Sequence, residues 1–242
     1  MDRLIYLAMG GAKAAMQRQD VLANNLANAS TTGFRAELQA FRAVPVRGDG
    51  ASTRVYALET TTGYDAQSGP LQTTGRALDV AARGNAWFAV QALDGTEAYT
   101  RAGAFEQNAE GQLVTPGGLP VLGDGGPITV PANATVEVSP DGTITATVGN
   151  GRPQAVGRLK MVTPEAPMQR GTDGLFRAAD GAELPADANA RLQSGALEGS
   201  NVSAVETMVA MISAARLFEQ QMKMLQSAEQ KEQGATKLLA PQ

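Results

Sequence analysis

The sequence predicts an α+β fold, with a discontinuous, coiled-coil-like helical domain built from the N- and C-terminal helices and a central all-β domain. Apolar residues recur with heptad-like spacing near both ends of the 242-residue chain. Short apolar runs separated by Asp-Gly and Gly-Gly turns fill the middle. The formal charge is −4, and the whole acidic surplus lies between residues 43 and 199. The middle therefore differs from the two ends in composition as well as in pattern.

The first predicted element is a helix over residues 5–29. Its apolar positions are three and four residues apart, which gives a narrow seam with a period of 3.5. The seam consists of Ile5, Ala8, Ala12, Ala15, Leu22, Leu26 and Ala29, with the polar Gln19 among them. Ser30-Thr31-Thr32-Gly33 follows, and Gly33 is suited to the position after a helix C-terminus.

Three asparagines, Asn24, Asn25 and Asn28, lie near the end of this helix. Asparagine is a mediocre helix former, because its amide competes for nearby backbone groups. Two interpretations stay open. The amides could hydrogen-bond across to another helix and fix its register, or they could face solvent or bond back to their own helix.

Residues 36–74 are predicted to form an extended connecting segment, because glycines and prolines interrupt β-branched residues there. The central β domain is predicted over residues 75–198. Its strand-like runs are LDVAA, WFAVQ, AYTR, QLVT, ITV, TVEV, TITAT and LKMV, and Asp-Gly pairs such as Asp94-Gly95 mark turns between them. A sandwich or a partly closed barrel fits this alternation.

The last domain, residues 199–242, supplies the second helix of the helical domain that residues 1–35 begin. Its seam consists of Ala204, Met208, Met211, Ala215, Phe218, Met222 and Leu225, and Gly234 marks its predicted end. Because both seams are rich in small residues and methionine, two such helices bury little apolar area between them. We therefore expect them to need further helical neighbours.

The composition excludes several kinds of chemistry. The chain has no cysteine and no histidine, so it lacks disulfides, thiolate or imidazole metal ligands and a Ser-His-Asp triad. Its negative charge argues against a nucleic-acid partner, and no apolar run is long enough for direct membrane insertion. Asp79 could be a general base, but it has no second acid at a telling spacing, so a hydrogen-bonded structural role is favoured. We expect no enzyme activity, no metal and no cofactor.

Several stretches resemble the rod and hook family of flagellar axial proteins. ANNLANASTTGFR (23–35) is similar to the family's N-terminal signature, and LEGSNVSAVETMVAMISAARLFEQQMKML (197–225) is similar to its C-terminal helix. TTGRALDVAARGNAWFAVQ, YTRAGAF and GQLVTPGGLPVLG are similar to its central part. Within the family, MDRLIYLAMGGA and FRAVPV (41–46) resemble the proximal rod subunit more than the distal one. Ala86-Trp87 departs from the Gly-Phe that is usual before Phe88.

The resemblance implies a structural subunit of the bacterial flagellar basal-body rod, which polymerises through its terminal helices into a tubular shaft that carries motor torque to the hook. It implies other copies of this chain and other rod proteins as partners. It also implies a place in the periplasmic space, reached through the flagellar type III export apparatus without a cleaved signal peptide. The predicted assembly interface consists of Leu22, Asn24, Asn25, Leu26, Asn28, Gly33, Phe34, Asn201, Val205, Met208, Met211, Ala215, Phe218, Met222 and Leu225.

Two other classes of protein stay open. One is a surface adhesin or binding module with helical oligomerisation ends. The lack of a convincing cleavable signal peptide argues against this class. Asp2 cancels the charge of Arg3, Gly10-Gly11 interrupt the apolar run, and Lys13 lies in the supposed cleavage site. The other is a carboxylate-based hydrolase built on the β domain. The lack of paired acidic residues at a suitable spacing argues against this class.

Overall fold

The structure is a computed structural model that describes residues 2–45 and 55–239, and it divides the chain into two compact units. The helical unit comprises Met1–Ala29, Glu37–Gly63 and Val202–Gln242. The β unit comprises Ser30–Ala36 and Tyr64–Asn201. Terminal helices that pack on each other and a β-rich middle confirm the predicted α+β class.

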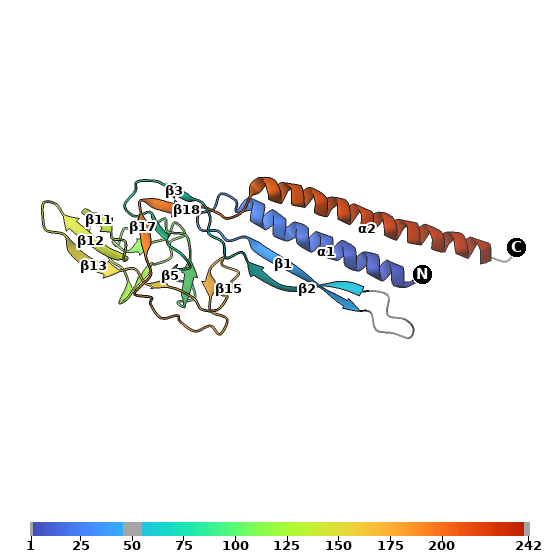
Figure 1. Cartoon of the computed structure of the whole chain (residues 1–242), viewed down its shortest axis with the longest axis horizontal. Helices are drawn as coiled ribbons and strands as arrows, with labels where there is room; N and C mark the ends of the chain where they lie inside the picture. The colour runs from blue at the N-terminus through green and yellow to red at the C-terminus, as the bar shows by residue number, and fades with distance from the viewer. Residues whose placement is uncertain (1, 46–54, 240–242) are drawn as a thin grey trace. The chain divides into compact units, whose positions relative to one another are not determined.

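The helical unit pairs helix α1 (Asp2–Ala27) with helix α2 (Ala204–Leu239). The start of α1 and the end of α2 lie at the same end of this pair, so the helices are antiparallel (Figure 1). Strands β1 (Glu37–Pro45) and β2 (Val55–Tyr64) form a two-stranded sheet, and β1 contacts α1. The predicted connecting segment 36–74 thus contains paired strands, and its residues 46–54 lie outside the described residues.

Alanines of α1 and a mixed row of α2 residues form the contact between the two helices. Ala8, Ala12 and Ala15 of α1 are buried, as the seam predicts. On α2 the buried positions are Thr207, Ala214 and Ala228, which together with Met211, Phe218, Gln221 and Leu225 follow the same four-three spacing. Gly11 of α1 sits directly against the side chain of Gln221, which a Cβ at Gly11 would meet at 2.9 Å. Small residues therefore let the backbones approach closely, and the buried apolar area stays modest.

Helix α2 begins at its predicted place but ends later than predicted. The Ser203 hydroxyl accepts the backbone N–H of Glu206 at 3.4 Å, as an N-cap does. The prediction that Gly234 ends the helix is wrong, since α2 continues to Leu239. One glycine costs a helix only about 1 kcal/mol, and the residues after it are good helix formers. Proline is the stronger breaker, and the first one downstream is Pro241.

The β unit contains a five-stranded antiparallel sheet of order β14-β5-β6-β16-β15 and a three-stranded antiparallel sheet of order β11-β12-β13. Four two-stranded pairs surround them: β3 with β18, β4 with β17, β7 with β8, and β9 with β10. The strands are β3 (Leu71–Thr73), β4 (Val80–Ala82), β5 (Trp87–Gln91), β6 (Glu97–Thr100), β7 (Glu106–Gln107), β8 (Leu113–Val114), β9 (Leu122–Gly123), β10 (Gly126–Pro127), β11 (Ala134–Val138), β12 (Thr143–Val148), β13 (Gln154–Arg158), β14 (Met161–Val162), β15 (Gln169–Arg170), β16 (Phe176–Arg177), β17 (Leu192–Ser194) and β18 (Ala196–Glu198).

Seven of the eight predicted runs of the β domain fall on strands β4, β5, β6, β8, β11, β12 and β14, whereas ITV (128–130) lies on none of these strands and Thr129 forms only an isolated bridge with Gln112. The Asp-Gly turns are formed as expected. Asp94 and Asp141 each accept the backbone N–H two residues later, at 3.0 and 3.1 Å. Hydrogen bonds from Thr96 hold the pKa of Asp94 below its ordinary value. The pairs β3–β18 and β4–β17 join residues 71–82 to residues 192–198, so distant parts of the chain lie side by side in this unit.

No helix within residues 2–45 and 55–239 is both long and apolar enough to cross a membrane.

Candidate functional site

The asparagines fasten the end of α1 to the start of β1. Asn25 is buried, its Nδ2 donates to the Glu37 carbonyl at 3.0 Å, and its Oδ1 accepts the Glu37 N–H at 2.8 Å. Asn24 donates to the Glu37 carboxylate at 3.0 Å, and Asn28 bonds back to Asn24. The back-bonding interpretation therefore holds for Asn28. Asn25 instead binds a strand, which neither interpretation included. Asn24 is exposed, as the solvent-facing interpretation allows, although its amide also donates to Glu37.

We expect Asn25→Ala to destabilise this attachment by about 1–3 kcal/mol, because it leaves both backbone groups of Glu37 without their partner. Hydrogen exchange of the Glu37 amide measures the effect, since that amide loses its acceptor. Asn24→Ala is the control, because its bond is exposed and such changes usually stay within about 0.5 kcal/mol. Unchanged protection of the Glu37 amide in Asn25→Ala would contradict the assignment.

Gly33 and Phe34 belong to the β unit and are buried there. The Gly33 N–H donates to the Glu198 carbonyl at 2.7 Å, so the prediction that Gly33 caps the helix is wrong. Its φ of 69° does lie in the left-handed region, and a Cβ there would be 2.4 Å from the Arg101 carbonyl carbon and the Ala102 nitrogen. Glycine is required because the backbone of this turn lies against the backbone of Arg101 and Ala102, directly after β6.

Gly33→Ala should destabilise the β unit by about 2–3 kcal/mol, because backbone strain and the clash with Arg101 add together. Gly75→Ala is a matched control: its φ of 74° is similar, but a Cβ there would meet nothing within 4 Å. The difference between the two variants in the free energy of unfolding, measured in urea, gives the contribution of the close approach of Gly33 to Arg101. Equal losses of stability would show that the approach to Arg101 has no energetic role.

The next residue, Arg35, enters a buried ionic network with Arg101 and Glu198. One Glu198 oxygen contacts Arg35 Nη2 at 2.9 Å, and the other contacts Arg101 Nη2 at 2.6 Å and Nε at 2.8 Å. The Gly69 N–H also donates to Glu198, at 3.0 Å. The exposed fractions of these three charged side chains are 3% or less. Two cations against one anion leave this network with a net positive charge inside the protein.

Backbone carbonyls and an indole ring compensate that charge. Arg101 donates to the carbonyls of Ala82, Gly84 and Ala86. Both guanidinium groups lie near the face of Trp87, with centroid distances of 6.0 Å for Arg35 and 5.8 Å for Arg101. Burial lowers the pKa of Arg101, Glu198 opposes that shift, and Arg35 adds to it.

Asn201 ties the same segment to a third stretch of chain. Its Oδ1 accepts the Ala36 N–H at 2.7 Å, and its Nδ2 donates to the carbonyls of Asp65 and Gln67 at 3.1 and 2.9 Å. Arg170 lies over the ring of Phe34 at 4.3 Å. Residues 33–36, 65–69 and 198–201 thus form one interlocked junction within the β unit.

A different kind of surface lies on the two helices. At positions beside the α1–α2 seam, α2 exposes Met208 and Met222 on one flank and Leu217 and Met224 on the other. Met9 and Met16 occupy the corresponding flank of α1, one heptad apart. In a self-sufficient two-stranded coiled coil these flanks usually carry charged residues. Here they are apolar and about half exposed.

The predicted interface residues therefore fall into three groups. Asn25, Gly33 and Phe34 are buried inside their own units. Half-buried positions are Leu22, Leu26, Asn28, Asn201, Met211, Ala215, Phe218 and Leu225. Exposed positions are Asn24, Val205, Met208 and Met222. Arg35, Glu37, Arg101 and Glu198 were not predicted. Arg35 and Arg101 are each the single charged residue of ANNLANASTTGFR and YTRAGAF, whereas Glu198 is one of five charged residues in residues 197–225, so the sequence does not single it out.

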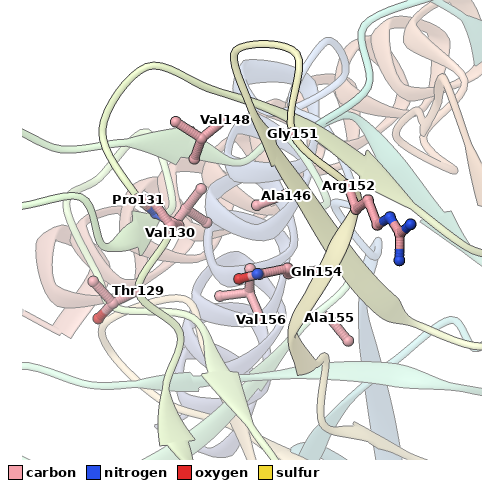
Figure 2. Close-up of a pocket in the computed structure, with 10 residues that line it drawn as sticks. All are labelled: Thr129, Val130, Pro131, Ala146, Val148, Gly151, Arg152, Gln154, Ala155 and Val156. Carbon is pink, nitrogen blue, oxygen red and sulfur yellow. The ribbon is translucent and has the colours of Figure 1, made fainter.

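The β unit also has a hollow of about 480 Å³ beside the hairpin of β12 and β13 (Figure 2). Arg152 is the one charged residue among those that line it there, so that lining holds no acid–base pair. Within the described part of the chain no group of three or more acidic side chains could hold a metal ion. Asp79 is buried and accepts from Arg76 Nε at 2.8 Å, so it is hydrogen-bonded as predicted.

Comparisons with known proteins agree along the chain. Residues 5–35 match the model of the family "Flagella basal body rod protein", residues 81–146 that of the "Flagellar hook protein FlgE/F/G D1 domain", and residues 193–238 that of the "Flagellar basal body rod FlgEFG protein C-terminal". The flagellar basal-body rod protein FlgF of Salmonella typhimurium is 48% identical over 250 residues, which cover 99% of each chain. FlgF of Escherichia coli is 47% identical over 251 residues with the same coverage. FlgG of Agrobacterium fabrum is 33% identical, over 94% of this chain and 96% of that protein.

Proposed function

The chain belongs to the flagellar basal-body rod family, and we propose that this structural rod subunit polymerises through the flanks of its two helices into the tubular shaft that carries motor torque to the hook. The observation that supports this most directly is the apolar character of those flanks. Val205, Met208, Ile212 and Met222 leave 38–69% of their surface exposed on one side of α2. Apolar patches of this kind mark protein–protein contacts.

Assembly would add helices to a layer that, in the single subunit, has only two helices and buries little apolar area. Alanine supplies the buried α1 side of the seam and part of the α2 side, so the helix pair buries less apolar area than a leucine-based coil. Helices of neighbouring copies, packed on the flanks, would supply the missing burial. Contacts of this heterologous type do not close on themselves and give a helical tube.

The junction around Arg35, Glu198 and Asn201 has a different role in this proposal. It holds the segment between α1 and β1 in one conformation inside the β unit. Of the predicted interface, the exposed and half-buried helix positions would meet neighbours, whereas Gly33 and Phe34 would shape the junction. The β domain of residues 75–198 would then form the outward-facing part of the subunit.

The place of the subunit in the rod is a further part of the proposal. The two FlgF proteins share more identity with this chain than the FlgG protein does, which favours a proximal position. Partners would be other copies of the chain and other rod proteins. The subunit would reach the periplasmic space through the flagellar type III export apparatus without signal cleavage.

We propose no enzymatic activity for this subunit. Asp79→Asn should lower the stability of the β unit by about 1–2 kcal/mol, because a charge-assisted bond to Arg76 is weakened. Hydrolysis of generic ester and glycoside substrates should be the same for both proteins. A hydrolytic activity that Asp79→Asn abolishes without changing the unfolding curve would support the hydrolase class instead.

Electron microscopy of basal bodies tests the proposed function. A peptide tag inserted at the exposed turn Asp94-Gly95 marks the outward-facing β unit without touching the helices. We expect the tag on the surface of the proximal rod in every basal body of motile cells. Tagged protein on the outer cell surface, with unlabelled rods, would favour the adhesin class.

A further inference from the structure

Methionine is the only sulfur-containing residue type of this chain, which has nine methionines and no cysteine. Met161 and Met168 are buried in the β unit, at 1% and 4% exposure. Five others, on α1 and α2, have exposures between 38% and 56%: Met9, Met16, Met208, Met222 and Met224. The accessible thioethers among the described residues are therefore concentrated on the helices.

All five exposed methionines lie beside the α1–α2 seam rather than opposite to it. Met9 and Met16 are seven residues apart on α1, and Met208 and Met222 are fourteen apart on α2. Met224 lies seven residues after the exposed Leu217 on the other flank. The column of α2 opposite the seam is mostly polar instead, with Arg216, Lys223 and Gln230 following Val209, and the neighbouring column is polar throughout, with Glu206, Ser213, Gln220 and Ser227. The methionines thus coincide with the surface proposed above to contact neighbouring subunits.

An exposed thioether reacts with a peroxide without any catalyst. The sulfur lone pair attacks one peroxide oxygen, the O–O bond breaks, and that oxygen stays on sulfur as a sulfoxide. The second oxygen takes up the proton and leaves as water or an alcohol, so the sulfur loses two electrons and the peroxide gains them. The product is a polar, chiral side chain with a strong hydrogen-bond acceptor in place of an apolar one.

We propose that these five methionines form a modification site, at which oxidation by peroxide makes the free subunit unable to enter the rod. The inference rests on the proposed function, because it requires that assembly buries the flanks. A sulfoxide oxygen buried among apolar neighbours lacks a donor, and one such group weakens a contact by about tenfold. In the assembled rod the same thioethers would be covered, so oxidation would act before assembly and hardly after it.

The test compares the full-length subunit in two pools from cells given a pulse of hydrogen peroxide during rod growth. Mass spectrometry measures sulfoxide at each methionine in the unassembled pool and in isolated basal bodies. We expect sulfoxide at Met9, Met16, Met208, Met222 and Met224 to be at least about tenfold depleted in the assembled pool. Met161 and Met168 should stay reduced in both pools, because they are buried. Equal sulfoxide content in the two pools would overturn the inference.

A variant with all five changed to leucine separates oxidation from other effects of peroxide. Leucine keeps the volume and apolar character of methionine but has no sulfur. We expect this variant to assemble at the same rate with and without peroxide, while the wild type slows. If peroxide slows both equally, the flank methionines are not the sensitive site. The proposed function fails differently, namely if a charge at Met208 leaves untreated cells with complete rods.

Discussion

Glu198→Ala should lower the free energy of unfolding of the β unit by about 3–5 kcal/mol, since removing the shared partner of a buried ion pair leaves uncompensated charge. Arg35 and Arg101 would then face each other, both buried, with no carboxylate between them. The Gly69 N–H would also lose its acceptor. For a unit of this size the loss corresponds to roughly 10 °C in the unfolding midpoint.

Urea unfolding followed by tryptophan fluorescence measures this change in the full-length protein. Trp87 is the chain's one tryptophan, and it lies within 6.0 Å of both guanidinium groups, so its emission reports on the network itself. Glu137→Ala is the matched control: it removes the same side chain from an exposed strand position and should cost less than about 0.5 kcal/mol. Similar unfolding curves for the two variants would mean that the network is not coupled to folding.

A second substitution tests whether repulsion between the two arginines causes the loss. In the Glu198→Ala background, Arg35→Met should restore part of the stability, because it removes one unpaired cation and keeps the apolar stem. In the wild type the same substitution should destabilise, since it breaks the pair with Glu198. Of the two arginines, Arg35 is the better one to substitute in this test. Its Nε is buried without a hydrogen-bond partner among the described residues, whereas Arg101 satisfies three carbonyls.

The helices and strands β5, β6, β11 and β12 were predictable because their signals are local, whereas the two longest strands, β1 and β2, were predicted only as an extended connecting segment. The alanine seam at Ala8, Ala12 and Ala15 and the Asp-Gly turn after Asp94 each need only neighbouring residues to be recognised. The buried network was not predictable in this way. Arg35, Arg101 and Glu198 are separated by 66 and 97 residues, and no periodicity links them. Short strands such as β3 and β18 were missed for the same reason, since only their distant partners make them strands.

The predicted apolar stripe of α2 is partly half-buried and partly exposed, and this division has a geometric cause. The seven predicted positions share a heptad pattern, but a single partner helix covers only part of such a stripe. The structure turns Met211, Phe218 and Leu225 towards the α1 side, with Thr207, Ala214 and Ala228 buried beside them. Met208 and Met222 remain outside this contact. The predicted stripe therefore shares Met211, Phe218 and Leu225 with the observed seam, and it misses Thr207, Ala214, Gln221 and Ala228.

Met208→Asp should abolish swimming while leaving the isolated subunit folded. Met208 is 47% exposed, so in the free subunit a carboxylate there stays in water and the unfolding curve should barely change. In the proposed rod the same carboxylate would be buried between helices without a cation, at a cost of several kcal/mol. Because many copies repeat this contact, the penalty recurs along the shaft. We expect soluble, exported protein, non-motile cells and basal bodies without completed rods.

Gln220→Asp is the matched control, because it introduces the same charge on the same helix. Gln220 is exposed and lies in the polar column with Glu206, Ser213 and Ser227, away from the seam and its flanks. Its carboxylate would stay solvated in the free and in the assembled subunit, so these cells should swim normally. Motility agar and electron microscopy of basal bodies compare the two variants, and circular dichroism confirms that both subunits fold. If Met208→Asp cells swam as well as Gln220→Asp cells, the exposed flank of α2 would face solvent in the rod, and the contacts between subunits would have to lie elsewhere.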